Sequence, residues 1–265
     1  MTGQRDQLKA DDIRRSLTTQ IIGRNVLYYP SVASTMDVAR AVAITGAAEG
    51  TVVGADEQTA GRGRLRRQWL APSGNIAVSV ILYPQIVVLP SLIMLASLAV
   101  VHAIETTTGL KATIKWPNDV LINERKVCGI LIEADARPTE SGRATYAIIG
   151  IGINVNLDPA RYSEIESTAT SLSLEAGRTL ERLPLIRRLV VELDRLYLDL
   201  KSGVSLYEEW RDRLLTLGKS VTVTSVEGSY DAVAESVDRD GSLLVRLADG
   251  SARRVVAADV TLKAK

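Results

Sequence analysis

The chain has 265 residues, 46% of them hydrophobic, and its 32 basic and 31 acidic residues give a net charge of +1. This length predicts one large domain with room for a small second one, and the balanced charge argues against a large nucleic-acid footprint. The single cysteine, Cys128, excludes a disulfide framework or a thiolate metal site within one chain, and the polar start is unlike a signal peptide, so we expect a cytoplasmic protein.

The elements expected in the first 160 residues mix helices with strands. Residues 1–25 form a short polar extension with a helix over 11–20. Ser34 is expected to cap the next helix, with Asp37 completing the capping pattern. The mixture predicts an α+β layer, a mixed sheet with flanking helices. The expected helices cover 35–45 and 91–108, and the expected strands cover 51–55, 75–82, 111–115, 119–122, 126–134 and 146–156.

One segment imitates a membrane span. Residues 86–104 carry no formal charge over 19 positions, which is near the lower length for crossing a bilayer. Pro90 and two serines interrupt it, and we interpret residues 91–108 as a helix buried by the sheet and ended by Gly109. His102, the only histidine, lies in that helix, where packing is the expected role.

The last third of the chain changes character after Gly218. Residues 185–200 have the pattern of an amphipathic helix, and a second helix carries Trp210. Beyond them, short strands are separated by turn pairs such as Asp240-Gly241, a strong hairpin signal. We therefore expect a small antiparallel barrel and divide the chain into residues 1–25, 26–217 and 218–265. The expected strands of the barrel cover 220–226, 230–237, 243–247 and 253–256.

An arginine-rich loop is the first candidate for function. Residues 58–69 alternate glycine and arginine at Gly61, Arg62, Gly63 and Arg64 and end at Trp69. Glycine lets the backbone approach a ligand, and arginine offers a fork of donors suited to carboxylate and phosphate. Such a loop can close over a small anionic ligand. A solvated basic loop and an RNA-binding arm are the alternatives.

A second candidate follows at residues 115–120, which read Lys-Trp-Pro-Asn-Asp-Val. Proline, Asn118 and Asp119 end a strand at a turn rich in polar side chains. A carboxylate and an amide there can hold hydrated magnesium against phosphates. Lys126 begins the next apolar strand, where it can snorkel to solvent or place a cation in the same cleft.

Together these segments resemble the biotin protein ligases. The family pattern is a Gly-Arg-Gly-Arg loop ending in Trp, then Lys-Trp-Pro-Asn-Asp, then a lysine shortly before a glycine, here Lys126 and Gly129. Residues 34–37, 150–155 and 169–172 are similar to further family segments, so the resemblance covers about residues 27–265. One departure is Arg66, which stands where the family usually has Gly and would stiffen the loop or add a phosphate contact.

The resemblance implies an ATP-dependent ligase that joins biotin to a lysine of a biotin carboxyl carrier domain through biotinyl-AMP. It also implies a class II synthetase-like catalytic domain, an SH3-like C-terminal domain and Mg²⁺ as cofactor. The implied catalytic residues are Lys126, Arg64 and Asp119, with Asp119 as the magnesium ligand. The implied biotin site is Ser34, Thr35, Met36, Gln58, Gly61, Arg62, Gly63, Arg64, Lys126 and Gly129, and the implied ATP site is Arg62, Arg64, Trp69, Asn118, Lys126 and Asn154.

Two other functions stay open at this point. A lipoate-type acyl ligase shares the general fold and chemistry but normally lacks the Gly-Arg-Gly-Arg loop. A biotin-sensing regulator or nucleic-acid binder could use the same loop, although the charge balance speaks against DNA. The chain resembles the short family form without a DNA-binding domain, and we expect a partner carrier domain, no membrane and no DNA, with a homodimer as an open option.

Overall fold

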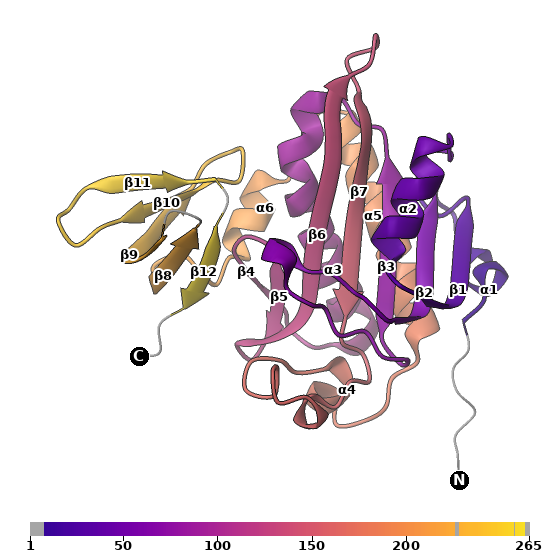
Figure 1. The fold of residues 1–265 in the computed structure, drawn as a ribbon, viewed down its shortest axis with the longest axis horizontal. Coiled ribbons are helices and arrows are strands. Elements are labelled where there is room, and N and C mark those ends of the chain that lie inside the picture. Colours follow the sequence, from indigo (N-terminus) through magenta and orange to yellow (C-terminus); the bar gives the residue numbers. More distant parts are fainter. Residues whose placement is uncertain (1–7, 226–227, 257, 263–265) are drawn as a thin grey trace.

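The computed structural model describes residues 8–225, 228–256 and 258–262. Within them a seven-stranded sheet has the strand order β1-β2-β3-β7-β6-β5-β4, drawn in Figure 1. Its first two strands run parallel and every other neighbouring pair is antiparallel. The strands are β1 (Val26–Val32), β2 (Val52–Gln58), β3 (Ile76–Leu82), β4 (Thr113–Lys115), β5 (Asp119–Ile122), β6 (Arg125–Pro138) and β7 (Ala144–Ile153).

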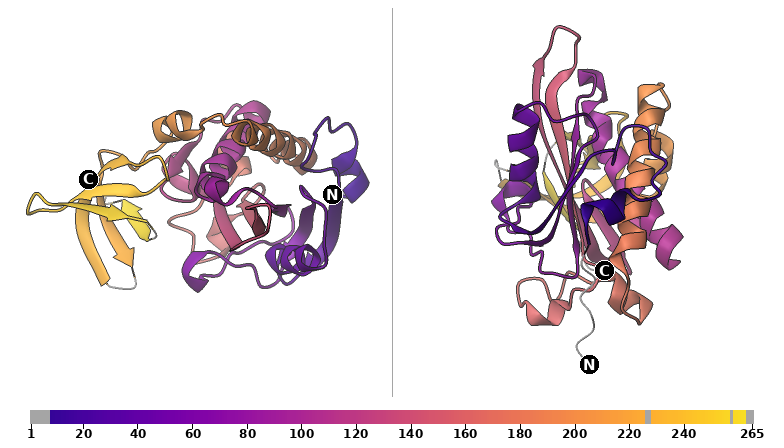
Figure 2. Two further views of the ribbon diagram at one scale, coloured as in Figure 1. Left: turned by 90° about the horizontal axis from the view of Figure 1, so that it is seen from above. Right: turned by 90° about the vertical axis from the view of Figure 1, so that its right-hand side faces the viewer.

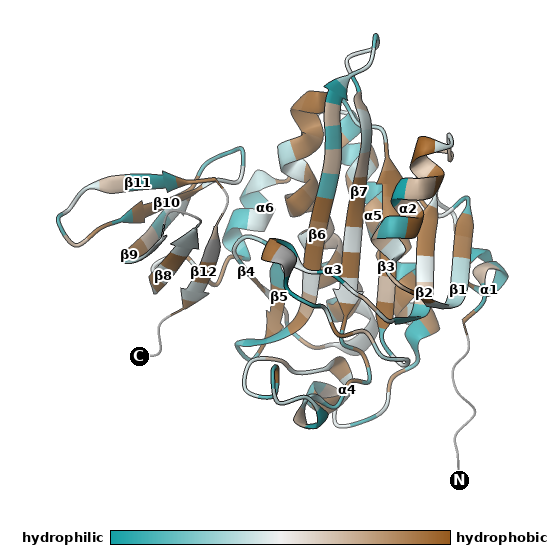
Figure 3. Cartoon of the chain, in the orientation of Figure 1, coloured by the Kyte–Doolittle hydropathy of each residue, from teal (hydrophilic) through white to brown (hydrophobic). Residues whose placement is uncertain are grey.

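Helices cover both faces of this sheet, as the view from above in Figure 2 shows. The pair α3 and α5 packs on one face, against the larger apolar cluster. The shorter α2 packs on the other face, over a small cluster that includes Met36 and Ile148. The hydropathy colouring of Figure 3 shows apolar residues along the central strands. The helices are α1 (Ala10–Arg14), α2 (Thr35–Ile44), α3 (Leu92–Thr108), α4 (Leu172–Ala176), α5 (Arg182–Lys201) and α6 (Tyr207–Asp212).

The C-terminal part forms a separate antiparallel sheet of five strands in the order β11-β10-β9-β8-β12. It lies beside the β4 edge of the main sheet, with α6 nearby (Figure 1). Trp116 joins the two parts, because its buried indole N–H donates to the carbonyl of Gly241 at 2.8 Å. The strands are β8 (Ser220–Ser225), β9 (Gly228–Val237), β10 (Leu243–Arg246), β11 (Ala252–Val255) and β12 (Asp259–Leu262).

The α+β class, the mixed sheet and the small C-terminal sheet are thus as expected, with differences at particular elements. Strand β1 was not expected because Pro30 lowers the strand signal, yet proline is tolerated on an edge strand such as this one. The helix expected over 11–20 is wrong in length, since it ends at Arg14, before Ser16 takes a left-handed φ of 68°. Strand β12 is also additional, and the expected strand end at Val226 lies outside the described residues.

The apolar helix belongs to the core. The stretch from Ile86 to Thr108 is long and apolar enough to cross a membrane, but 56% of its most apolar window is buried inside the protein. Gly109 ends α3 with a left-handed φ of 75°, as expected. The ring nitrogens of His102 lie 3.3 Å from a carboxylate oxygen of Glu192 and 2.6 Å from one of Glu209, so His102 links α3 to α5 and α6.

Residues 8–25 pack against the main domain. The carboxylate of Asp194, a buried residue of α5, accepts hydrogen bonds from the backbone N–H groups of Gln20, Ile21 and Ile22 at 2.7–2.8 Å. Because N–H donors buried without a partner are costly, this carboxylate fixes the path of the chain into β1.

Replacing Asp194 by Ala should lower the free energy of unfolding by about 2–4 kcal/mol, since it removes three charge-assisted bonds to backbone donors at once. Urea unfolding measures the change. Asp199→Ala is the matched control, because Asp199 makes an exposed ion pair with Arg195 on the same helix and should cost less than about 1 kcal/mol. Equal losses for the two variants would show that Asp194 is not the anchor.

Candidate active site

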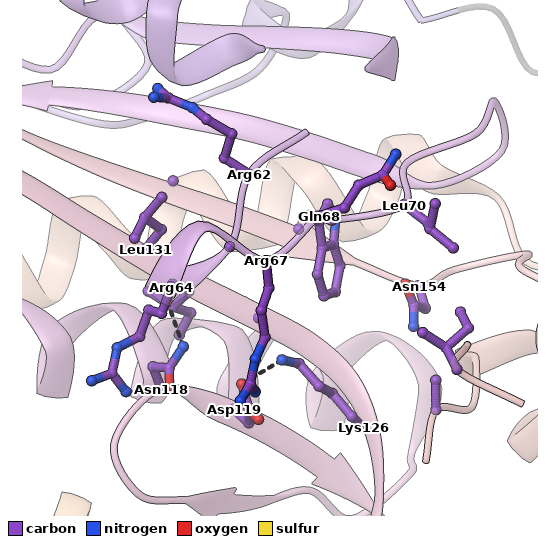
Figure 4. Close-up of a pocket in the computed structure, with 18 of the residues that line it drawn as sticks. Arg62, Arg64, Arg67, Gln68, Leu70, Asn118, Asp119, Lys126, Leu131 and Asn154 are labelled. Atoms are coloured by element: carbon purple, nitrogen blue, oxygen red, sulfur yellow. Dashed lines mark hydrogen bonds and ion pairs between the residues drawn. The ribbon is translucent and has the colours of Figure 1, made fainter. Parts of the chain in front are cut away.

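A cavity of about 570 Å³ opens on the α2 side of the main sheet. Its walls come from the start of α2, the loop over residues 58–71, the turn between β4 and β5, strands β6 and β7, and the end of β12 (Figure 4). All of the motif segments that the sequence singles out therefore meet in one place. A cavity of this size is in the range that holds a small organic ligand.

Three glycines form the floor of the cavity. Gly129 and Gly152 face each other across β6 and β7, and Gly150 precedes Gly152 by two residues in β7. A Cβ atom on Gly152 would stand 2.3 Å from the indole nitrogen of Trp69, and one on Gly150 would stand 2.5 Å from the sulfur of Met36. Glycine is needed here because Trp69 and Met36 lie directly on the strand backbone.

A β-bulge turns Lys126 into the cavity. Along β6, Cys128 pairs with Val120 while Lys126 pairs with Leu121, so Val127 has no partner in the ladder. Side chains alternate between the faces of a strand, and without the extra residue Lys126 would lie on the face opposite to Gly129. The bulge puts both on the cavity side and leaves Val127 and Cys128 in the core.

Lys126 is already paired in this site. Its ammonium nitrogen lies 2.6 Å from Oδ1 of Asp119 and 5.4 Å from the centre of a Trp69 ring. The side chains of Lys126 and Asp119 keep 31% and 18% of their surface exposed, so both can meet a ligand that enters the cavity. The pair presents a cation and an anion side by side (Figure 4).

Backbone pairing also holds Lys126 in place. Its N–H donates to Thr168 and its carbonyl accepts from the N–H of Thr170, both at 2.9 Å. Asn154, an expected ATP-site residue, lines the cavity, and its amide donates to the carbonyl of Thr170 at 3.1 Å. The segment 169–172, which resembles a family segment, therefore pairs with the start of β6 and helps to hold Lys126 in place.

The arginine loop is a narrow hairpin. Trp69 donates to the carbonyl of Gly61 at 2.9 Å, and Gly63 donates to the carbonyl of Arg67 at 2.8 Å. The tip is a 3₁₀ turn, Arg64–Arg66, in which Leu65 takes a left-handed φ of 53° and is exposed. A non-glycine residue in that region is uncommon and carries strain.

The two expected arginines point in different directions. Arg64 donates to Oδ1 of Asn118 at 3.1 Å and to the carbonyl of Ala258 at 3.2 Å, so it connects the loop tip to both sheets. Arg62 extends away from Lys126 in Figure 4 and pairs with Asp37 on α2 at 2.6 Å. In this conformation both arginines line the cavity, and Arg62 anchors the loop to α2.

Ser34 departs from its expected role as a capping residue. It occupies the N-cap position of α2, but its hydroxyl makes no capping bond. The hydroxyl is buried, with 1% of the residue exposed, and has no hydrogen-bond partner among the described residues. Because a buried hydroxyl without a partner is costly, the Ser34 hydroxyl is available to a water or to a polar ligand group at this end of the cavity.

The cavity is lined by all of the expected site residues except Gly61. Gly61 lets the hairpin close, since a Cβ at this position would stand 2.4 Å from the carbonyl oxygen of Trp69. Sequence reasoning missed Arg67, whose side chain runs toward Asp119 and Lys126 in Figure 4. It also missed Gly150 and Gly152 as floor residues, although their alternation in a strand was a usable signal. Other lining residues that were not expected are Gln68, Leu70, Val78, Lys115, Leu121, Glu124, Ile130, Leu131, Ile151, Glu164, Ile165, Ser167, Thr168, Ala169, Thr261 and Leu262.

Cys128 takes no part in the chemistry of the site. It is fully buried on the core side of β6, and burial raises the pKa of its thiol far above the usual range. A thiol held neutral in this way is a poor nucleophile and a poor metal ligand.

Two family models match the chain. Residues 28–154 match the biotin/lipoate A/B protein ligase family, and residues 216–263 match the biotin protein ligase C-terminal domain. The bifunctional ligase/repressor BirA of Bacillus subtilis is 37% identical over 97% of this chain and 79% of the relative. The biotin–[acetyl-CoA-carboxylase] ligase of Mycobacterium tuberculosis is 31% identical over 90% of this chain and 91% of the relative.

Solved structures agree with these matches. The biotin protein ligase from Aquifex aeolicus, solved in complex with biotin and ATP, has a TM-score of 0.76 and 27% identity. The match covers 91% of this chain and all of that one, so it includes both sheets.

The glycine floor yields a test that needs no ligand. Gly152→Ala should push Trp69 off the sheet, because the new methyl group would overlap the indole. Trp116 and Trp210 are buried, so a red-shifted tryptophan emission and stronger iodide quenching would report on Trp69. Gly63→Ala is the control, since its methyl group would meet only an ordinary 3.5 Å contact. Unchanged emission in Gly152→Ala would contradict the assigned packing.

Proposed function

The chain belongs to the biotin protein ligase family, and from that premise we propose how its own residues carry out the ATP-dependent ligation of biotin. The proposed reaction has two steps. Biotin carboxylate first attacks the α-phosphate of ATP, which gives biotinyl-AMP and pyrophosphate. A carrier lysine then attacks the acyl carbon and releases AMP. The observation that supports this most is that Lys126, Asp119, the arginine loop and the unpartnered Ser34 hydroxyl border one cavity.

The first step must bring two anions together, so its barrier is electrostatic and positional. Lys126 is the cation best placed to meet both, because it extends from the cavity floor and keeps part of its surface exposed. We assign it the contact with the biotin carboxylate and the α-phosphate. Arg64 borders the same space from the loop and is assigned to the phosphate side.

Asp119 fits a magnesium ion that arrives with the nucleotide. The described residues hold no cluster of three or more His, Cys, Asp or Glu side chains that could bind a metal by themselves. Mg²⁺ usually keeps several waters and takes one or two carboxylates together with substrate phosphates. A single half-buried carboxylate beside Lys126 suits that arrangement. When bound, the ion would neutralise phosphate charge.

The two ends of the cavity suit the two ends of biotin. Biotin's ureido ring needs hydrogen-bonding groups in a narrow slot, and Ser34, Thr35 and Gln58 lie together at one end. Trp69 offers a flat ring for adenine beside Lys126. Asn118 and Asn154 border the space assigned to phosphate and ribose. The hairpin loop over this space would shield the reactive acyl-adenylate from water.

The partner that we propose is the biotin carboxyl carrier domain of a carboxylase, in the cytoplasm. Incubation with labelled biotin, ATP and a carrier domain tests the function. Label on the carrier that requires ATP and is not competed by lipoate is the expected result. Transfer of lipoate in place of biotin would instead favour the related acyl ligase.

Lys126→Ala should lower the rate of pyrophosphate release by at least about 100-fold while the melting temperature stays close to that of wild type, because it removes the cation that meets both substrates. Lys111→Ala, at an exposed position, is the control. Normal pyrophosphate release by Lys126→Ala would overturn the assignment.

Arg64→Ser should release biotinyl-AMP more readily than it slows its synthesis. Arg64 joins the loop tip to Asn118 and Ala258, and losing a charge-assisted bond costs about 1.5–3 kcal/mol, or roughly tenfold to a hundredfold in escape. The measurement mixes the variant with biotin, ATP and serum albumin and blots for biotin. Arg24→Ser, which changes an exposed arginine, is the control. Albumin labelling no stronger than with wild type, at normal pyrophosphate release, would show that Arg64 does not retain the intermediate.

A further inference from the structure

A chain of buried hydroxyl and amide groups lies behind the Ser34 end of the cavity. The hydroxyl of Ser79 on β3 donates to the hydroxyl oxygen of Thr35 at 2.8 Å. Thr35 in turn donates to Oε1 of Gln58 twice, from its backbone N–H at 2.8 Å and from its hydroxyl at 3.0 Å. Ser79 is fully buried and Thr35 is 2% exposed, so neither hydroxyl exchanges these partners for water.

This series of hydrogen bonds fixes which end of the Gln58 amide faces the ligand. A backbone N–H can only donate, so the atom of Gln58 that meets Thr35 must be the oxygen. The Thr35 hydroxyl has one proton, and while it accepts from Ser79 that proton is directed at the same oxygen. The Gln58 nitrogen is therefore turned away from Thr35, toward the base of the arginine loop.

That nitrogen lies close to the backbone of Gly61 in the arginine loop. A Cβ on Gly61 would stand 3.1 Å from Nε2 of Gln58. The Ser34 hydroxyl, which lines the same end of the cavity, has no hydrogen-bond partner among the described residues. This end of the cavity thus offers N–H and O–H donors and leaves them to a ligand acceptor.

We propose that Ser79 is a positioning residue, which acts through Thr35 to hold the Gln58 amide with its N–H groups facing the ureido carbonyl oxygen of biotin. The inference rests on the proposed function, because the biotin carboxylate must reach Lys126 and so places the ureido ring at the opposite end. The Ser34 end of the cavity would then be selective. A ligand that places an acceptor oxygen there binds, whereas a ligand that places N–H groups there is rejected because donors would face donors.

A pair of ligands of nearly equal shape separates this role from simple packing. 2-Iminobiotin replaces the ureido carbonyl by a group that is protonated at neutral pH and donates hydrogen bonds. Calorimetry with biotin and with 2-iminobiotin, without ATP, gives both dissociation constants. Ser79→Ala frees the Thr35 hydroxyl to accept from a turned amide, so only the Thr35 backbone N–H still selects the Gln58 oxygen and the preference for this orientation weakens. The biotin constant should rise about threefold to tenfold, as for a lost buried hydrogen bond, while the iminobiotin constant stays level or falls.

The matched control is Ser97→Ala. Ser97 is equally buried, but its hydroxyl donates to the carbonyls of Ile93 and Met94 within α3 and touches no part of the cavity. Both dissociation constants should keep their wild-type values. A rise by the same factor for both ligands in Ser79→Ala, or no change in either, would overturn the positioning role. A wild-type protein that binds no biotin would contradict the proposed function instead.

A second substitution tests the amide polarity directly. Gln58→Glu keeps the shape of the side chain but replaces its donor by an acceptor. It should weaken biotin binding at least tenfold and bring the constants of the two ligands closer together. Retained biotin affinity in Gln58→Glu would overturn the assigned orientation. If Ser79→Ala lowers the melting temperature too far for calorimetry, Ser79→Cys, which has a weak donor of similar size, replaces it. The dissociation constants of biotin and 2-iminobiotin are then compared in the same way.

Discussion

A one-residue bulge at Val127 decides which face of the main sheet carries Lys126. Strand side chains alternate strictly, so Lys126 reaches the same face as the glycine floor only because Val127 stands outside the ladder. The bulge leaves Val127 and Cys128 in the core and sets the Lys126 ammonium 2.6 Å from Asp119. Every assignment in the site depends on that cation, since the first step that we propose joins two anions in this cavity.

The turn between β4 and β5 ties the cavity to the C-terminal sheet. Trp116 faces that sheet and bonds to Gly241, whereas Asn118, two residues on, accepts from Arg64 of the loop. Arg64 also reaches Ala258, and the end of β12 contributes Thr261 and Leu262 to the cavity wall. The small sheet is therefore part of the site, and a displacement of it would alter the loop that covers the ligand.

Local signals in the sequence predict the fold class and most elements well, because α3, α5 and the central strands have strong apolar patterns. They fail at β1, where Pro30 is tolerated only because the strand is an edge, and at α1, which Ser16 ends early. For the site, motifs identify the residues but not their directions. No local pattern shows that Arg62 turns outward to Asp37, that the Ser34 hydroxyl is left without a partner, or that Ser79 stands behind Thr35, since these depend on segments that fold together from distant positions.

We propose that this cavity activates biotin before the acceptor lysine arrives. Exchange of labelled pyrophosphate into ATP, with Mg²⁺ present and the carrier domain left out, tests it most directly. We expect exchange only when biotin is added, because the reverse of the first step requires biotinyl-AMP held in the site. Exchange without biotin, or none with biotin in a protein that still labels the carrier, would contradict it.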